Sequence, residues 1–419
     1  MRAPNITVIY YSRNGTVHEL AAAAADGASA FGAAVRLLRV EDDGSHRVSP
    51  ATAGLRQVPV AALDDLAWAD GLLFATPTYY GNVSYPLKRF IDSTSPLWRE
   101  GALADRVVAG MTTSNSRHGG RETTLLALYQ SMYHWGALIM PAGQLDAALA
   151  GSGSNPYGVC APSAADGAVS DTGLRAARTL GLRLCDVTQR SVSPAPGDAA
   201  QPGDVRPRVA VIYCPSEEST HALAAALAAG ARAEGAEVRI RLVGKPSAGR
   251  RGAGRRAAGL ARAIPAASVT DVEWADALVF GAGARIGMMA PQLLEFIESC
   301  EPQRSAGRLA GKAATGFVTT AHQHSGSESA LLAFYNAMHH WGCVIVPPGY
   351  TDPAFAAAGG NPYGISYATD AGPTPDRAAT DAALAQGRRL ARTAGRLRMR
   401  PPTPGPAALR PPVSATAVR

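Results

Sequence analysis

The sequence contains the same motifs twice, and this repetition limits the possible fold more than any other feature. Trp68-Ala69-Asp70 recurs as Trp274-Ala275-Asp276, an offset of 206 residues (274 − 68). The same offset relates HWG at 134–136 to 340–342 and NPYG at 155–158 to 361–364. No gap is needed between residues 68 and 158, so the sequence predicts two homologous domains in tandem rather than one large domain.

The two copies are separated by a segment with the composition of a linker. Residues 191–207 are SVSPAPGDAAQPGDVRP, and residues 401–419 are rich in proline and alanine. We therefore expect a first domain at 1–190, a linker at 191–207, a second domain at 208–398 and a disordered tail at 399–419.

The composition excludes several classes of protein. Hydrophobic residues make up 47% and charged residues 17%, which is enough for buried cores, and no apolar run approaches the ~20 residues that cross a bilayer. The five cysteines form no CxxC pair, which indicates a reducing compartment without a disulfide framework or a metal site. Because a strand-like run begins within a few residues of Met1, we expect no signal peptide and a cytoplasmic location.

The net charge of +7 could indicate a nucleic-acid partner, but its distribution does not. Basic residues cluster at positions 241–262, interleaved with glycine, alanine and serine and without any aromatic residue. Nucleic-acid sites combine positive charge with aromatic stacking platforms. We therefore interpret this region as a solvated insertion and expect neither a nucleic-acid nor a membrane partner.

Short apolar runs alternate with helical segments in each copy. In the first copy, strands are predicted at 6–11, 35–40, 71–75, 106–112 and 137–140, and helices at 17–30, 85–93, 122–133 and 173–188. Runs such as ITVIYY and GLLFA are typical of parallel strands that are covered on both faces. This order predicts an α/β fold of two doubly wound domains, each a five-stranded parallel sheet flanked by helices.

Three polar loops follow the first, third and fourth predicted strands, where a doubly wound sheet binds its ligands. The first loop, SRNGTV at 12–17, places hydroxyl and amide donors and a glycine at the start of a helix, which favours a phosphate. The same residue types are ordinary helix caps, so a capped helix is the alternative. The loop lacks the Walker lysine and the GxGxxG spacing, which argues against a nucleoside triphosphate or a Rossmann dinucleotide.

The other two loops could hold a planar ring. TPTYYGN at 76–82 offers two tyrosines beside polar backbone, and TSNSRHGG at 113–120 offers hydroxyls, an amide and glycines. Tyrosines that cover the end of the sheet and a flexible surface loop are the alternatives. Three such loops at three strand ends, taken together, favour a ligand site.

These motifs, in this order, resemble the WrbA family of flavodoxin-like, FMN-dependent NAD(P)H:quinone oxidoreductases. The matching segments are YYSRNGTV, TPTYYGN, SRHGGRET, YHWGALIMPAG and NPYG, and the resemblance spans residues 5–188 and, in weaker form, 208–395. It implies flavodoxin-like domains, FMN as cofactor and NAD(P)H as co-substrate. Two electrons would pass from NAD(P)H to a quinone or similar planar aromatic acceptor.

The resemblance also implies roles for individual residues. The first loop would bind the FMN phosphate, the second would line the isoalloxazine ring, and the third would bond its pyrimidine side. Apart from the resemblance, the side chain of Arg117 or His118 in the third loop could stabilise a reduced, anionic flavin. Trp98 would stack over the flavin site of a neighbouring subunit and His134 would lie near the flavin edge, so these two are the candidate catalytic residues. The expected cofactor-binding residues are Ser12, Arg13, Asn14, Gly15, Thr16, Val17, Thr78, Tyr79, Tyr80, Ser114, Asn115, Ser116, Arg117, His118, Gly119 and His134.

The chain departs from the family pattern in three ways. Ser116-Arg117-His118 replaces a glycine-rich stretch of the loop after the fourth strand, which disfavours close approach of the backbone to the flavin. Tyr79-Tyr80 replaces an Arg-Phe pair, which removes a charge near the substrate or cofactor. In the second copy, PSEES at 215–219 replaces SRNGT at 12–16, so that the glycine is lost and two carboxylates would repel a phosphate. We therefore expect one FMN per chain and a second domain that serves as a scaffold.

Assembly and function follow from the same resemblance. In the resembled family, neighbouring subunits of a tetramer complete the pocket, so we expect a homodimer of two-domain chains. The alternatives to a quinone reductase are a flavin reductase, an enzyme that tailors an aromatic metabolite, a non-enzymatic FMN-holding electron carrier and a flavin-free interaction protein.

Overall fold

The computed structural model describes residues 2–42, 57–143, 148–149, 153–163, 168–192, 206–244 and 263–398. The expected linker lies outside the described residues at 193–205, as do the expected tail at 399–419 and most of the basic insertion, at 245–262. Arg241 is described; it belongs to a strand and pairs with Asp271 at 3.0 Å.

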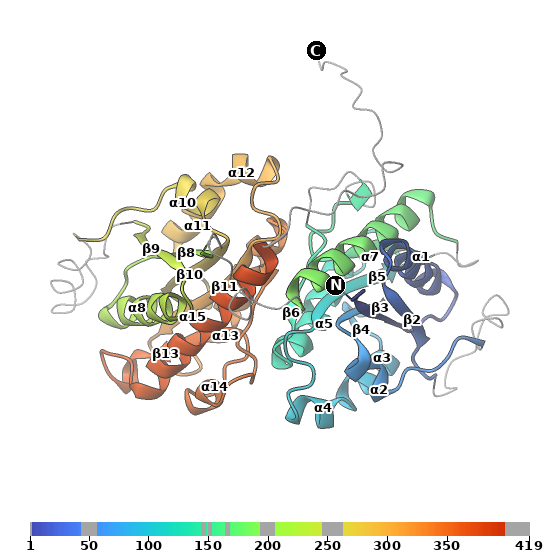
Figure 1. The fold of residues 1–419 in the computed structure, drawn as a ribbon, viewed down its shortest axis with the longest axis horizontal. Coiled ribbons are helices and arrows are strands. Elements are labelled where there is room, and N and C mark those ends of the chain that lie inside the picture. Colours follow the sequence, from blue (N-terminus) through green and yellow to red (C-terminus); the bar gives the residue numbers. More distant parts are fainter. Residues whose placement is uncertain are drawn as a thin grey trace, which may run out of the picture.

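The first domain is a doubly wound parallel sheet (Figure 1, blue to green). Its strands lie in the order β2-β1-β3-β5-β6, with β7 beside the carboxyl end of β5 and the short β4 paired antiparallel with β3. The elements are β1 (Asn5–Tyr10), α1 (Thr16–Phe31), β2 (Ala34–Arg39), α2 (Leu63–Trp68), β3 (Gly71–Tyr79), β4 (Asn82–Val83), α3 (Tyr85–Asp92), α4 (Ser95–Arg99), β5 (Val107–Ser114), α5 (Arg121–His134), β6 (Leu138–Ile139), β7 (Val159–Pro162) and α7 (Asp171–Ser191).

The second domain repeats this plan (Figure 1, yellow-green to red). Its strands lie in the order β9-β8-β10-β11-β12, with β13 beside β11. The elements are β8 (Arg208–Tyr213), α8 (Glu218–Ala233), β9 (Glu237–Leu242), α10 (Val269–Trp274), β10 (Ala277–Gly283), α11 (Pro291–Ser299), α12 (Glu301–Ser305), β11 (Ala313–Thr320), α13 (Ser327–His340), β12 (Val344–Ile345), α14 (Pro353–Ala357), β13 (Ile365–Ala368), the 3-10 helix η3 (Thr369–Ala371) and α15 (Arg377–Arg398).

The two sheets join into one. β6 and β12 pair antiparallel, with Ile139 opposite Ile345. These residues are 206 positions apart, so equivalent residues of the two copies face each other, as a local twofold axis requires. The domains are therefore not independent units on a tether: a continuous sheet runs through both of them.

A pair of helices packs closely against one face of each sheet. In the first domain these are α1 and α7, which lie side by side in Figure 1. A Cβ on Gly27 would lie 2.1 Å from the carbonyl oxygen of Arg178, and one on Gly181 would lie 2.1 Å from that of Ala24. Only glycine allows the backbones this close. The second domain has the same contacts between α8 and α15, at Gly230 and Gly387.

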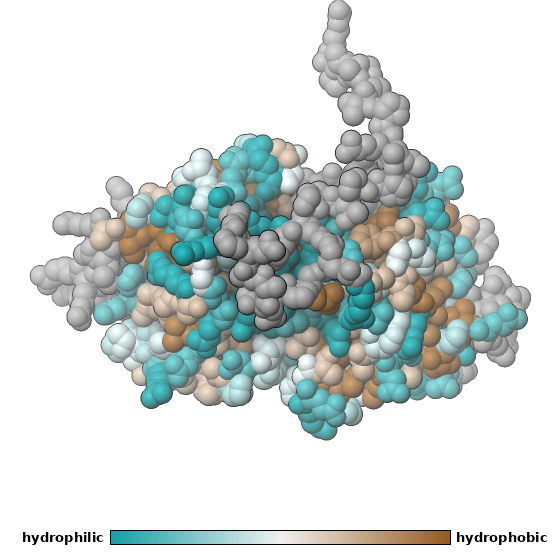
Figure 2. Space-filling model, in the orientation of Figure 1, coloured by the Kyte–Doolittle hydropathy of each residue, from teal (hydrophilic) through white to brown (hydrophobic). Residues whose placement is uncertain are grey.

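The central strands of the sheet are mostly buried. All eight residues of β5 are buried, as are five of the six in β1. In the view of Figure 2, hydrophilic residues are interspersed with hydrophobic ones over both lobes. None of the described helices is both long and apolar enough to span a bilayer.

The predicted α/β, doubly wound, flavodoxin-like fold is confirmed in both copies. The prediction omitted α2, α4, β4 and β7, which are all short. It also did not foresee that the sheets would join, because that contact depends on strands of two residues each.

Candidate functional site: a polar pocket at the strand ends of the first domain

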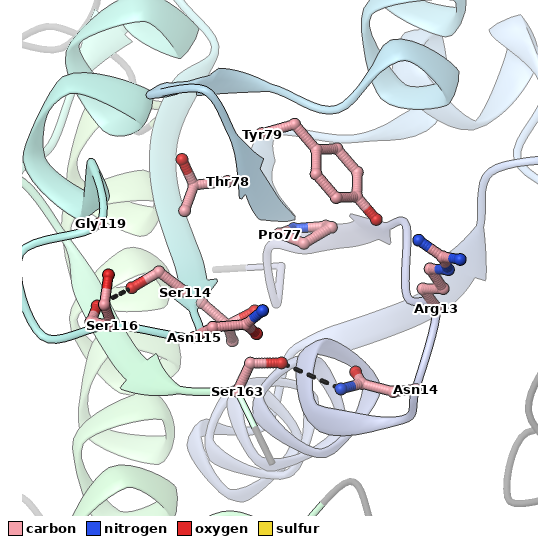
Figure 3. A pocket seen from close by; sticks show the side chains of 11 residues that line it. Arg13, Asn14, Pro77, Thr78, Tyr79, Ser114, Asn115, Ser116, Gly119 and Ser163 are labelled. Carbon is pink, nitrogen blue, oxygen red and sulfur yellow. Dashed lines mark hydrogen bonds between the residues drawn. The ribbon is translucent and has the colours of Figure 1, made fainter. Parts of the chain in front are cut away.

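A pocket of about 460 Å³ opens at the carboxyl ends of β1, β3, β5 and β7 (Figure 3). Parallel strands point all of these ends to the same edge of the sheet, which brings together loops that are far apart in sequence. The lining residues are Arg13, Asn14, Pro77, Thr78, Tyr79, Thr113, Ser114, Asn115, Ser116, Gly119 and Ser163.

The loop after β1 brings the start of α1 to the pocket. Gly15 caps this helix with φ of 98°, a conformation that favours glycine. The Gly15 amide donates to Ser12 Oγ at 3.1 Å, and Asn14 Nδ2 donates to Ser163 Oγ at 2.9 Å. The second bond fastens the loop to the residue after β7. The amides and the dipole at the start of α1 make this side of the pocket suited to an anion.

The hairpin of β3 and β4 forms the next wall. Tyr80 and Gly81 turn between the strands with φ of 52° and 75°. The turn packs tightly on the start of α5: a Cβ on Gly120 would lie 2.6 Å from Gly81 Cα. Thr78 accepts a 2.5 Å hydrogen bond from Thr124, and in Figure 3 the Tyr79 ring extends toward Arg13. The Tyr80 side chain is fully exposed.

The loop between β5 and α5 forms the opposite wall. Ser114 Oγ donates to the Ser116 carbonyl at 2.5 Å and accepts from Arg121 Nε at 2.6 Å. The Gly119 amide donates to the same Ser116 carbonyl at 3.2 Å. A Cβ on Gly119 would lie 2.6 Å from Ser116 Oγ, so the loop is tightly folded.

One polar atom in the pocket wall lacks a partner within the described part of the chain. Thr113 is 1% exposed, and its Oγ1 makes no hydrogen bond to any described residue. A buried hydroxyl without a partner costs about 1–3 kcal/mol. Since Thr113 lines the pocket, a ligand there could supply the missing hydrogen bond.

The structure brings together eight of the predicted cofactor-binding residues as lining residues: Arg13, Asn14, Thr78, Tyr79, Ser114, Asn115, Ser116 and Gly119. Ser12, Gly15, Thr16 and Val17 shape the first loop and the first turn of α1 instead. Tyr80, Arg117 and His118 are exposed and do not line the pocket. Their contact with a cofactor remains a prediction.

His134 and Trp98 lie elsewhere. The 14-residue helix α5 begins at the pocket and ends at His134, so the rise of a helix separates His134 from that end by about 20 Å. Burial lowers the pKa of His134, whose ring lies edge-on to Tyr363 of the second domain at 5.7 Å. Trp98 Nε1 donates to the His134 carbonyl at 3.0 Å, and its ring lies edge-on to Tyr350 at 5.4 Å. Both therefore belong to the contact between the domains.

Sequence reasoning missed four residues of the site. Pro77 and Thr113 lie within the loop segments that were quoted, each directly before a residue that was named. Ser163 follows β7, which was not predicted. Arg121 stands in the quoted segment SRHGGRET, and its contact with Ser114 could have been suspected because it begins the helix that follows the loop.

Known proteins resemble each half of the chain. The sequence pattern of the family described as NADPH-dependent FMN reductase matches residues 4–150 and again residues 207–356. A Deinococcus radiodurans protein named NAD(P)H dehydrogenase (quinone) is 37% identical over 166 residues, which are 38% of this chain and 83% of the relative. One of the same name from Solidesulfovibrio magneticus is 34% identical over 202 residues, 44% of this chain and 98% of the relative. The structure of a WrbA-like flavodoxin from Agrobacterium tumefaciens is 27% identical, covering 45% of this chain and 99% of its own, with a TM-score of 0.34.

The pocket residues are compatible with FMN. The start of α1, with its positive-φ glycine, suits the FMN phosphate, and the polar loop after β5 suits the edge of the flavin ring. The buried Thr113 hydroxyl, which has no partner among the described residues, could bond the cofactor. The chain belongs to the NADPH-dependent FMN reductase family, in which it is a flavodoxin-like, FMN-dependent oxidoreductase that takes electrons from NAD(P)H and contains the family domain twice.

Proposed function

We propose that the chain transfers two electrons from NAD(P)H to a quinone or a similar planar aromatic acceptor, with FMN held in the pocket of the first domain. The observation that carries this proposal is the pocket itself: three polar loops meet around a space that the Tyr79 side chain borders. The relatives named NAD(P)H dehydrogenase (quinone) support the choice of acceptor.

Each loop has a separate task in this proposal. Arg13, Asn14 and the first amides of α1 would hold the phosphate, since a cation and a helix start both favour an anion. Thr78 and Tyr79 would border the isoalloxazine ring, and residues 114–119 would bond its polar edge. When bound, FMN supplies the two-electron chemistry, while the protein positions it and limits access of water.

The second domain would serve as a scaffold. Its sheet continues that of the first domain through β6 and β12, so it completes a surface that a single domain would leave open. We further propose that two chains associate into a four-domain particle with two FMN molecules. His134 and Trp98, which lie too far from the pocket of their own domain, would reach a flavin only if another chain brought one to them.

The test uses the purified full-length chain. Its absorption spectrum should show bound flavin at one FMN per chain, and it should oxidise NADH or NADPH with a panel of quinones. Light scattering should give about twice the mass of one chain. Reduction of added free FMN without any quinone-dependent turnover would favour the flavin reductase alternative, and an absence of bound flavin would contradict the assigned pocket.

A further inference from the structure

Arg121 forms hydrogen bonds to a residue of the pocket wall, although Arg121 itself does not line the pocket. It is the first residue of α5, and its Nε donates to Ser114 Oγ at 2.6 Å. Its Nη2 donates to the Ser114 carbonyl at 3.3 Å. Ser114 is 5% exposed and lines the pocket. A single guanidinium therefore holds both the side chain and the backbone of one pocket residue.

The charge of this arginine opposes the helix dipole, whereas Glu122 in the same first turn favours it. The start of a helix carries partial positive charge, so an acidic or neutral residue is preferred there. Within the described ranges of the chain, no carboxylate lies at ion-pair distance from Arg121. The equivalent helix of the second domain begins with Ser327, which makes an ordinary bond from Oγ to the Gln323 carbonyl at 3.3 Å. In the second domain a neutral serine therefore takes the place of this positive charge.

The contacts of Arg121 also act on the rest of the loop. Ser114 Oγ accepts from Arg121 and donates to the Ser116 carbonyl, so its orientation is fixed. The Ser114 carbonyl accepts from both Arg121 and the Ser163 amide. Hydrogen bonds to a carbonyl polarise its peptide group, which makes the amide of the following residue, Asn115, a stronger donor. Asn115 lines the pocket.

We propose that Arg121 is a positioning residue that fixes the loop at 114–119 and keeps a positive charge behind the pocket wall, thereby stabilising reduced over oxidised FMN. This inference rests on the proposed binding of FMN in this pocket. A fixed charge near a flavin ring changes its electronics, and a cation favours the state that carries more negative charge. Arg117 and His118 on the same loop are both exposed, and neither lines the pocket.

The test compares the redox properties of full-length variants. Arg121→Gln removes the charge but keeps hydrogen-bond donors, whereas Arg121→Lys keeps the charge and loses the paired donors. Arg232→Gln is the matched control, because Arg232 is an exposed residue in α8 of the second domain. The measurements are the FMN dissociation constant and the midpoint potential of bound flavin.

We expect Arg121→Gln to raise the dissociation constant for reduced FMN about tenfold relative to that for oxidised FMN. For a two-electron couple, a tenfold change lowers the midpoint potential by about 30 mV. Arg121→Lys should retain most of the wild-type potential, and Arg232→Gln should leave it unchanged. The melting temperature of the flavin-free variants identifies any general loss of folding.

Two results would overturn the inference. A wild-type potential in Arg121→Gln would make Arg121 a purely structural residue, and equal shifts in Arg121→Gln and Arg121→Lys would exclude the charge as the cause. Asn14→Glu separates this from a failure of the proposed function. If it weakens FMN binding while Arg121→Gln changes nothing, the pocket assignment stands and only the role of Arg121 fails. If neither variant affects FMN, both proposals fail.

Discussion

The pocket of the first domain and the same place in the second domain differ in how their polar groups are satisfied. Thr113 Oγ1 has no partner among the described residues, whereas its equivalent Thr319 bonds Thr220 at 2.9 Å. Thr220 in turn belongs to a chain of hydroxyls, since Ser216 lies 2.8 Å from it. Thr220 replaces Val17. In the second domain the hydroxyl at this position is therefore satisfied by internal hydrogen bonds.

The first residues of α1 and of its equivalent α8 also differ in how they would receive an anion. Gly15 caps α1 with φ of 98°, while Glu217 caps α8 with extended backbone and Glu218 occupies the place of the glycine. Two carboxylates at a helix start interact favourably with the dipole themselves and repel an anionic ligand. Under our proposal that only the first domain binds FMN, the second copy lost its ligand by acquiring hydrogen-bond and charge partners of its own, while the packing of the domain was kept.

The largest effect is expected when the first domain receives the carboxylate that the second domain has at the equivalent position, Glu217 in place of Asn14. Asn14→Glu should weaken FMN binding roughly 100-fold, since a like charge close to the phosphate costs about 3 kcal/mol in a partly screened site. Asn14→Gln is the matched neutral control and should lose far less. The FMN dissociation constant checks the prediction. Equal losses in the two variants would place the phosphate elsewhere.

The contact between the domains is also unequal. Arg389 of α15 is 7% exposed and reaches into the first domain, where it pairs with Asp105 at 2.7 Å and donates to the Gly136 carbonyl at 2.6 Å. Its equivalent Arg183 donates to the Ala142 carbonyl within its own domain, and Gly311 stands where Asp105 would be.

Arg389→Met should therefore lower the free energy of unfolding by about 2–3 kcal/mol, because it leaves buried polar groups without partners. Arg392→Met on the same helix should cost less than about 1 kcal/mol, since Arg392 forms an exposed pair with Glu234. Urea unfolding of both variants measures the difference. Similar small losses would show that Arg389 is dispensable to the interface.

A histidine of the second domain replaces a tyrosine of the first near the local twofold axis. His339 is the equivalent of Tyr133, stacks on Tyr129 at 5.7 Å, and has its pKa lowered to about 3 by burial. In the unfolded chain His339 takes up a proton near pH 6.5, whereas in the folded chain it stays neutral down to about pH 3. The free energy of unfolding therefore falls as the pH drops from about 6.5 toward 3.

His339→Phe should remove this share of the acid sensitivity. Between pH 7 and pH 5, the wild type should lose about 2 kcal/mol more than the variant, which is 1.5 pH units below the unfolded pKa at 1.36 kcal/mol per unit. Unfolding free energies at the two pH values give the comparison. Parallel losses would mean that His339 is protonated in the folded state.

The sequence predicted most of the pocket but not the position of every site residue. Arg13, Tyr79 and Ser114 could be placed together because parallel strands end at one edge, which is a rule of topology. His134 and Trp98 could not be placed, because their partners Tyr363 and Tyr350 belong to the other copy. A pattern within one domain contains no information about which surface of a second domain will cover it.

Trp98 distinguishes the two interpretations of such a residue. Trp98→Ala should lower the unfolding free energy by about 1–2 kcal/mol, through loss of the bond to His134 and of the contact with Tyr350. Bound FMN should be retained. If quinone turnover falls while the unfolding free energy does not, Trp98 acts at an acceptor site that another chain completes, as the family resemblance implied.

The smallest expected effect comes from exchanging Val17 and its equivalent Thr220, the residue that bonds Thr319 in the second domain. Val17→Thr should supply Thr113 with the partner that Thr319 has, and so weaken FMN binding about fivefold if the Thr113 hydroxyl otherwise bonds the cofactor, a contact of about 1 kcal/mol. The reverse change, Thr220→Val, leaves Thr319 without that partner and should destabilise the second domain by about 1 kcal/mol without affecting FMN. The paired measurements are the FMN dissociation constant and the urea midpoint. Unchanged affinity in Val17→Thr, with the expected loss of stability in Thr220→Val, would show that the hydroxyl pair stabilises the second domain but that Thr113 takes no part in holding the flavin.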